Sequence, residues 1–304
     1  MATMKEHHFS GFTADGFHQV YYTEWGTANS LFPPIICIHG LARNRRDFTA
    51  LANFLSEHNR HVFSIDIPGR GDSSWFKNPK HYNFVQYMND VNTLIARIDC
   101  EKVDLIGTSM GGLIGMMMAA LPQTPINRLI MNDVGPQVPV KALWRLSKYI
   151  GKNPVFNGPG DAKAYFKTIY ADFGIEREED WDDLTASSIK QRADSQYVMK
   201  MDPEIKNAKH FTDFVKEFFH HPHKALEGII FDVDMWTVWE KVRCPVMVIR
   251  GHHSDLLLPE HIARMKRYHQ EVMLVTVENA GHAPALMNLR EQQIILDWLG
   301  YRLA

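Results

Sequence analysis

The chain has 304 residues, of which 45% are hydrophobic and 22% are charged, and its formal net charge is −2 at pH 7. This length allows one large α/β domain, or two modest ones, with a full hydrophobic core. Lysine and arginine are scattered among acidic residues without a long basic run, which argues against a nucleic-acid partner.

The sequence carries no evident targeting signal. Its start contains Lys5, Glu6, His7 and His8, whereas a secretory signal needs an apolar core of about 7–15 residues. Apolar stretches such as 113–121 are shorter than the roughly 18 residues that cross a bilayer. The three cysteines lie far apart and form no CxxC motif, as is typical of reduced thiols. We therefore expect a cytoplasmic protein without membrane contact, either a monomer or a homodimer.

The N-terminal part predicts a hairpin followed by strand–helix units. Two aromatic-rich runs separated by a turn at 14–16 predict an antiparallel hairpin over residues 7–25. Apolar runs bounded by turns predict buried strands, and apolar residues at every third or fourth position predict helices. In chain order these are a strand at 33–38, a helix at 46–57, a strand at 61–66, a helix at 83–99, a strand at 102–106, a helix at 111–121 and a strand at 128–133.

The pattern changes after residue 135. Helices are predicted near 138–150, 161–171, 178–193 and 208–220, with no convincing buried strand between them. Strands return at 244–249 and 272–277, with helices from about 259 and 289. This order predicts an α/β fold with a doubly wound, mostly parallel sheet and a helical lid inserted after the sixth strand. The expected domains are a core, 1–135 with 236–304, and a lid, 136–235.

The segment Gly107-Thr108-Ser109-Met110-Gly111 joins a predicted strand to a predicted helix. A Gly-x-Ser-x-Gly pattern at such a junction is typical of a nucleophile elbow, a tight turn that exposes the serine hydroxyl. The pattern alone arises by chance in roughly one chain in ten of this size, so its context has to support it. The strand before Ser109 and the helix after it supply that context.

A serine nucleophile needs a general base, which is itself held by an acid. His282 follows the last predicted strand, and Asp255 follows the strand before it. Both lie at the carboxyl edge of the sheet, where Ser109 also lies. We predict Ser109, His282 and Asp255 as the catalytic residues. Asp133, which ends another strand, is the alternative acid.

Backbone amides have to stabilise the oxyanion of a tetrahedral intermediate. The amide of Met110, next to the nucleophile, is one predicted donor. The second is the amide of Leu41, in the loop after the strand at 33–38, where Gly40 allows close approach. His39 is expected to hydrogen-bond the backbone of this loop.

These motifs together resemble the α/β-hydrolase superfamily, in its lid-bearing esterase, lactonase and C–C hydrolase branch. The resemblance runs from near residue 35 to the C-terminus, and it implies the α/β-hydrolase fold. A serine at the elbow argues against the dehalogenases and epoxide hydrolases of this fold, which carry an aspartate there. Ala283 stands where C–C hydrolases commonly place a tryptophan. The matching stretches are 39–41, 66–73, 107–112, 132–136, the Asp255 loop and Gly281-His282.

The sequence thus predicts a serine hydrolase that cleaves small to medium carboxylic esters or lactones through an acyl-enzyme on Ser109. The alternatives are a C–C bond hydrolase of ring-cleavage diketones and a ligand receptor without turnover on the same scaffold. No organic cofactor is implied, and the histidine clusters at 220–223 and 252–253 lack the Cys or carboxylate partners of a familiar metal site. Aromatic residues in and beside the lid are candidates for substrate binding, and the alternative role for them is packing. The candidate substrate-binding residues are His39, Gly40, Trp144, Tyr165 and Trp236.

Overall fold

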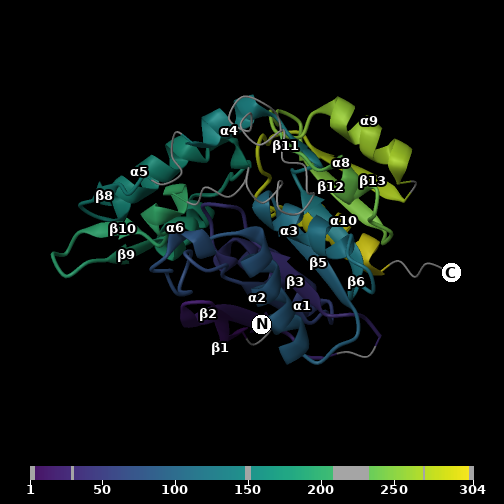
Figure 1. The fold of residues 1–304 in the computed structure, drawn as a ribbon. Helices are drawn as coiled ribbons and strands as arrows, with labels where there is room; N and C mark the ends of the chain where they lie inside the picture. The colour runs from purple at the N-terminus through teal and green to yellow at the C-terminus, as the bar shows by residue number, and fades with distance from the viewer. Residues whose placement is uncertain (1–3, 29–30, 148–151, 208–232, 270, 301–304) are drawn as a thin grey trace, which may run out of the picture.

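A computed structural model describes the chain except for residues 1–3, 29–30, 148–151, 208–232, 270 and 301–304. Its centre is an eight-stranded sheet in the order β1-β2-β4-β3-β5-β6-β12-β13 (Figure 1). The strands are β1 (Met4–Thr13), β2 (Gly16–Trp25), β3 (Ile35–Ile38), β4 (Val62–Ile65), β5 (Val103–Thr108), β6 (Ile126–Asn132), β12 (Val246–Gly251) and β13 (Val272–Val277).

The sheet is antiparallel at one edge and parallel elsewhere. β1 and β2 form the predicted hairpin, and β2 runs antiparallel to β4. From β4 to β13, neighbouring strands are parallel. All four residues of β3 and of β4 are buried, which explains their unbroken apolar sequences, since helices cover both faces of a parallel sheet. The predicted doubly wound, mostly parallel sheet is confirmed.

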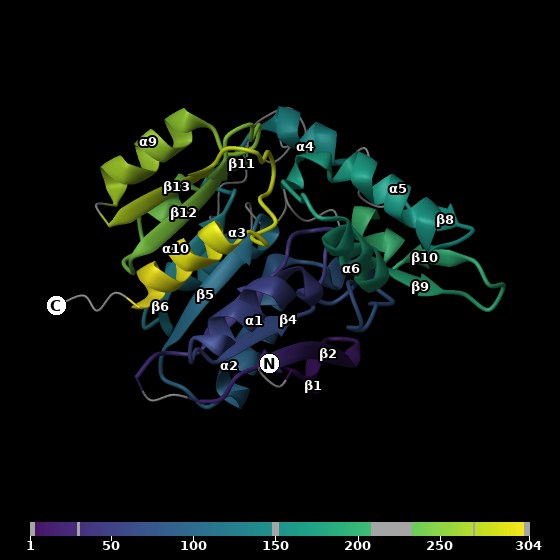
Figure 2. The same cartoon turned by 180° about the vertical axis from the view of Figure 1, so that it is seen from behind.

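Two hydrophobic clusters lie on opposite faces of this sheet, because successive strand residues alternate between faces. Ile35 belongs to the cluster with α1 and α10, and Ile36 to the cluster with α2, α3, α8 and α9. Figure 2 shows α1 and α10 in front of the sheet, and Figure 1 shows α2 and α3 on the other side. The helices outside the insertion are α1 (Thr49–Glu57), α2 (Phe84–Arg97), α3 (Met110–Ala119), α8 (Trp236–Trp239), α9 (Pro259–Tyr268) and α10 (Leu289–Gly300), with the short 3-10 helices η1 (Arg45–Phe48) and η2 (Pro79–His81).

An insertion separates β6 from β12, as predicted for the segment after the sixth strand. We call residues 137–234 the insert. Its described helices α4, α5 and α6 lie together to one side of the sheet in both ribbon views (Figures 1 and 2). The described elements are β7 (Gln137–Val138), α4 (Val140–Ser147), β8 (Val155–Phe156), α5 (Pro159–Ile169), η3 (Ala171–Phe173), α6 (Glu178–Ser188), β9 (Ile189–Gln191), β10 (Tyr197–Met199), η4 (Pro203–Asn207) and β11 (Val233–Asp234).

The insert contains strands that the sequence did not predict. The helix expected to run to residue 193 ends at Ser188, because the next three residues form β9 and pair with β10. β8 completes a three-stranded sheet, and β7 pairs with β11. Strands of two or three residues are too short to show an alternating pattern, so periodicity misses them. The helix predicted at 208–220 lies outside the described residues.

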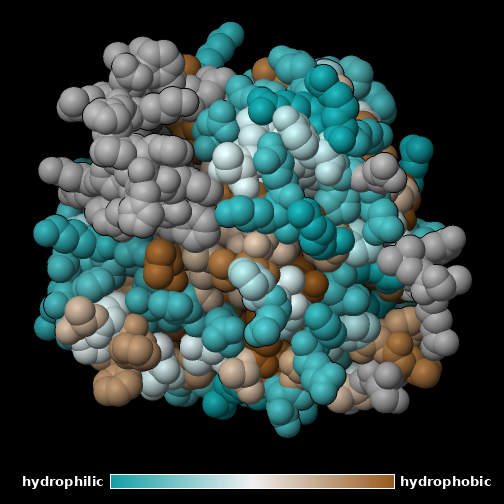
Figure 3. All heavy atoms as spheres, turned by 45° about the vertical axis from the view of Figure 1, so that its right-hand side comes forward, coloured by the Kyte–Doolittle hydropathy of each residue, from teal (hydrophilic) through white to brown (hydrophobic). Residues whose placement is uncertain are grey.

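The surface is mainly hydrophilic on the face shown in Figure 3, where hydrophobic residues gather in a band across the centre. Among the described segments, no helix combines the length and the apolar character that spanning a membrane requires.

Candidate active site

Ser109 lies in the sharp turn between β5 and α3. Its backbone has φ 51° and ψ −112°, a conformation that L-residues rarely adopt. The Ser109 amide donates to the carbonyl of Asn132 on the neighbouring strand at 2.9 Å, which ties the turn to the sheet. This is the strained strand–turn–helix geometry that the sequence predicted for the segment.

The glycines around Ser109 are required by close backbone contacts. A Cβ on Gly107 would lie 2.2 Å from the carbonyl carbon of Gly111. A Cβ on Gly111 would lie 2.0 Å from the carbonyl oxygen of Ile38, at the end of β3. Both distances are far below van der Waals contact, so the turn closes only with glycine at these positions.

Three side chains form a continuous hydrogen-bonded chain at this turn. Nε2 of His282 lies 3.0 Å from Oγ of Ser109, and Nδ1 of the same ring lies 2.7 Å from Oδ2 of Asp133. The Asp133 side chain is fully buried and that of His282 is nearly so. A neutral imidazole placed in this way can accept the serine proton at Nε2, while the carboxylate fixes its tautomer.

The Asp133 carboxylate is held by two further donors. Its Oδ1 accepts from the amide of Gly251 at 2.9 Å, and its Oδ2 accepts from the hydroxyl of Ser254 at 2.7 Å. Asp133 itself has a φ of 54° directly after β6, which turns its side chain toward the end of β12. These hydrogen bonds fix the position of the Asp133 carboxylate beside Nδ1 of His282.

The structure does not bring Asp255, the predicted acid, to the imidazole of His282, which binds the alternative acid Asp133. Asp255 binds Arg145 of α4 instead, through two hydrogen bonds of 2.8 Å. The sequence placed both acids correctly, each after a parallel strand. Asp133 lies immediately past its strand, whereas Asp255 is four residues past β12, in a loop that faces the insert.

The ion pair with Arg145 stabilises the charged form of the Asp255 carboxylate. Partial burial raises the pKa of Asp255, but the hydrogen bonds and charge of Arg145 outweigh burial and hold the pKa below its ordinary value.

The loop after β3 is built around a buried neutral histidine. The amide of Ile67 donates to Nε2 of His39 at 3.0 Å, so Nδ1 carries the proton and donates to the carbonyl of Gly40 at 2.7 Å. Burial lowers the pKa of His39 to about 3. The expectation that His39 hydrogen-bonds backbone is confirmed. Arg70 fixes the same loop from below, with Nε donating to the Leu41 carbonyl at 2.9 Å.

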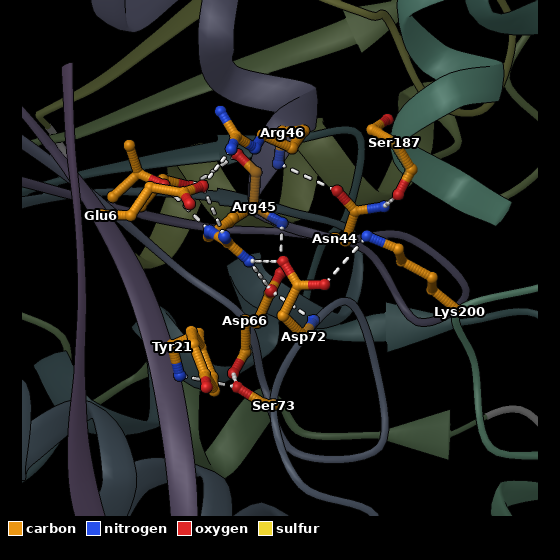
Figure 4. A network of polar contacts seen from close by, with 12 residues as sticks. Glu6, Tyr21, Asn44, Arg45, Arg46, Asp66, Asp72, Ser73, Ser187 and Lys200 are labelled. Carbon is orange, nitrogen blue, oxygen red and sulfur yellow. Dashed lines mark hydrogen bonds and ion pairs between the residues drawn. The ribbon is translucent and has the colours of Figure 1, made fainter. Parts of the chain in front are cut away.

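A polar network holds the next turn of this loop against the hairpin and the insert (Figure 4). The amide of Arg45 donates to Asp66 at 2.7 Å, and its guanidinium also pairs with Asp66 and, at 2.9 Å, with Asp72. Lys200 of the insert reaches Asp72 at 2.8 Å. The side-chain amide of Asn44 donates to the carbonyl of Ser187 at 3.1 Å. The Asp66 carboxylate thus orients this loop by accepting a backbone hydrogen bond.

A small cavity opens beside Ser109. Its volume is about 60 Å³, and core and insert both contribute to its wall. Four of the sequence-predicted residues, Gly40, Leu41, Ser109 and His282, are among those that line it. The other lining residues are Ala42, Arg43, Asp47, Phe48, Thr108, Tyr170, Phe173, Ile175, Leu184, Ala283, Pro284, Ala285 and Met287.

The aromatic substrate-binding candidates lie elsewhere as far as their side chains are described. Tyr165 packs against Phe156 and Phe166 within the insert. Trp236 is 2% exposed, donates to Gln137 at 3.1 Å and lies under the guanidinium of Arg264. Both side chains thus serve packing, because periodicity locates apolar faces but not the cavity they adjoin. The side chain of Trp144 lies outside the described residues.

The described residues contain no group of three or more metal-ligating side chains. His252 and His253 contact each other edge to face, and His252 pairs with Glu278 at 3.1 Å. The histidines at 220, 221 and 223 lie outside the described residues.

Sequence reasoning missed three residues of the site. Ser254 supports Asp133, Arg70 anchors the Leu41 loop, and Arg43 lines the cavity. Arg70 lies in the stretch 66–73, which matches the family pattern, and Ser254 directly precedes Asp255. Both residues are therefore close in sequence to residues that the motifs identified. Nothing in a single sequence tells such a supporting residue from a surface residue.

Comparisons with known proteins agree with this fold. The sequence profile described as "Alpha/beta hydrolase family" matches residues 35–293. A 3-hydroxybutyrate-oligomer hydrolase of Cupriavidus necator is 39% identical over 277 residues, which cover 90% of each chain. A solved structure from Rickettsia typhi superposes with a TM-score of 0.86 at 32% identity, covering 99% of this chain and 100% of that one. An alpha/beta hydrolase structure from Novosphingobium aromaticivorans gives 0.81 at 29% identity, with 98% and 99% covered.

The profile spans most of the chain, and the Cupriavidus relative exceeds 30% identity over nearly all of it. The chain belongs to the alpha/beta hydrolase family and is an enzyme of the hydrolase class.

Proposed function

We propose that this protein hydrolyses carboxylic esters through an acyl-enzyme on Ser109, with His282 as general base and Asp133 as the acid that orients it. The observation that carries the proposal is the chain of hydrogen bonds from Ser109 through His282 to Asp133. The Arg145-bound Asp255 is assigned no role in proton transfer.

In the first half of the reaction, Oγ of Ser109 attacks the ester carbonyl while Nε2 of His282 takes its proton. The oxyanion of the tetrahedral intermediate accepts hydrogen bonds from the amides of Leu41 and Met110. The alcohol then leaves with the proton from His282, and the acyl group remains on Ser109.

In the second half, His282 removes a proton from water as the water attacks the acyl-enzyme. Collapse of the second intermediate releases the carboxylic acid and returns the proton to Ser109. Asp133 stabilises the imidazolium in both halves without itself taking the proton.

Short oligomers of 3-hydroxybutyrate are the proposed substrates within the ester class. The support is the 39% identity over 90% of both chains to a relative named for hydrolysis of such oligomers. The small cavity beside Ser109 agrees with short acyl units.

The cysteines Cys37, Cys100 and Cys244 are free thiols, which agrees with the expected cytoplasmic location.

Multiple-turnover kinetics test the proposal. The native protein should hydrolyse p-nitrophenyl butyrate and the dimer and trimer of 3-hydroxybutyrate, and Ser109→Ala should abolish turnover with an unchanged melting temperature. Activity that survives in Ser109→Ala would overturn it. Turnover of a vinylogous diketone without ester turnover would point to a C–C hydrolase, and a stall after about one event would point to a receptor.

A further inference from the structure

An ion pair lies in the wall of the cavity beside Ser109. Nε of Arg43 donates to both carboxylate oxygens of Asp47, at 3.1 and 3.0 Å, and a terminal nitrogen donates to Oδ1 at 2.5 Å. Both side chains line the same cavity as Ser109 and His282. The catalytic steps above use neither of them.

The side chains of Arg43 and Ser109 both lie close to Gly40. A Cβ placed on Gly40 would lie 3.8 Å from Cβ of Ser109 and 3.9 Å from Cγ of Arg43. The stem of Arg43 therefore lies close to the catalytic turn, and the ion pair that it carries lines the same cavity.

The two members of the pair differ in what they offer a ligand. Arg43 has a side chain only 4% exposed, and it also donates to Ser188 at 2.8 Å and lies over the ring of Tyr170. The side chain of Asp47 is 22% exposed. Asp47 is thus the more accessible member of a pair that lines the cavity, and Arg43 is its fixed support.

Asp47 favours a hydrogen-bond donor over an anion. A carboxylate accepts hydrogen bonds at about four lone-pair sites and donates none. Burial lowers the pKa of Arg43, but the Asp47 charge outweighs burial and holds the pKa above its ordinary value. The ion pair is neutral as a whole, so a substrate carboxylate gains no net attraction from it.

The cavity size limits the group that can enter. One water needs roughly 10–15 Å³ of volume measured in this way. A cavity of about 60 Å³ therefore holds about four to six non-hydrogen atoms, the size of a hydroxybutyryl unit. Apolar walls, including Phe48, Phe173 and Leu184, suit its carbon chain.

We propose that Asp47, held by Arg43, is the specificity-determining residue that accepts a hydrogen bond from a hydroxyl on a substrate unit of about four carbons. The enzyme then selects short hydroxyl-bearing esters over unsubstituted esters of equal length. This inference rests on the proposed ester hydrolysis at Ser109.

The test compares pairs of esters that differ only by the hydroxyl. In the acyl half these are p-nitrophenyl 3-hydroxybutyrate and p-nitrophenyl butyrate, and in the alcohol half the 3-hydroxybutyl and butyl esters of butyric acid. The native enzyme should favour the hydroxyl-bearing member of one pair by at least about tenfold in kcat/KM, because a hydrogen bond to a charged group contributes about 1.5–3 kcal/mol. Asp47→Asn should reduce that ratio at least fivefold.

The same variant should gain activity toward an anionic substrate. Asp47→Asn leaves the Arg43 charge uncompensated, so hydrolysis of p-nitrophenyl hydrogen succinate should rise relative to p-nitrophenyl butyrate. Arg43→Lys, which retains both charges, should keep the hydroxyl preference. The matched control is Arg46→Met. Arg46 lies in the same turn but pairs with Glu6 of β1 (Figure 4), so all ratios should stay native.

Active sites are titrated with a fluorophosphonate, so that each kcat/KM refers to folded enzyme only. The ratios between substrates then do not depend on partial unfolding of a variant. The inference is overturned if the native enzyme shows no hydroxyl preference in either pair, or if Asp47→Asn leaves that preference unchanged. If no ester is turned over in a Ser109-dependent way, the proposed function itself is wrong.

Discussion

Nδ1 of His282 lies 2.7 Å from Oδ2 of Asp133, while Asp255 is bound to Arg145 by two hydrogen bonds of 2.8 Å. The acid that completes the chain to Ser109 thus comes from the end of β6. The aspartate of the loop after β12 instead connects the core to α4 of the insert.

This difference predicts opposite results for two matched substitutions. Asp133→Asn should lower kcat by about 10⁴-fold, because an amide favours the wrong imidazole tautomer. Asp255→Asn should lower kcat by less than about tenfold, since a partly exposed ion pair contributes about 1 kcal/mol or less. Steady-state kinetics on p-nitrophenyl butyrate measure both. The reverse order of effects would restore Asp255 as the acid.

Ser254 is predicted to position Asp133. Ser254→Ala removes the hydroxyl that donates to Oδ2 of Asp133, so kcat should fall about tenfold or more at nearly constant KM. Ser254→Thr, which keeps the hydroxyl, should recover most of the rate. The control is Ser56→Ala, whose hydroxyl donates to Asn53 in α1. Equal rates in Ser254→Ala and the native enzyme would remove this role.

The elbow should tolerate no side chain at Gly111. Gly111→Ala places a Cβ against the carbonyl of Ile38, so the free energy of unfolding should fall by about 3 kcal/mol. Gly160, in the first turn of α5, has nothing within 4 Å of an added Cβ. Gly160→Ala should therefore be neutral or stabilise by up to about 1 kcal/mol. Urea denaturation compares them, and equal effects would contradict the steric argument.

His39 should make the stability pH-dependent. Its pKa is about 3 in the folded chain and 6.5 as an ordinary histidine, so between these values the unfolded chain binds more protons. The free energy of unfolding should then fall on acidification, by up to about 1.4 kcal/mol per pH unit for this group.

The contribution of His39 is isolated by substitution. The destabilisation caused by His39→Gln should shrink as the pH falls from 7 toward 4.5, since the native histidine loses its advantage in that window. A pH-independent difference for His39→Gln would show that the ring is not held neutral.

The sequence by itself determined the sheet and the elbow, and it placed His282 at the edge of the sheet where Ser109 lies. Buried strands such as β3 are continuous apolar runs, and the turn at Ser109 is set by local contacts that only glycine permits. His282 was identified from its position after the last strand, because parallel strands present their carboxyl ends at one edge. The sequence did not predict the three-residue strand β9, because a segment so short shows no periodicity that would indicate its pairing with β10.

Only the tertiary structure decided which aspartate reaches His282 and which residues line the cavity. Asp133 and Asp255 both follow parallel strands, so chain order alone cannot separate them. The choice depends on a positive φ at Asp133, on donors from Gly251 and Ser254, and on the arginine that binds Asp255 from the insert. The donors to Asp133 and to Asp255 lie at least 110 residues away from them in the chain, so local sequence does not set these contacts.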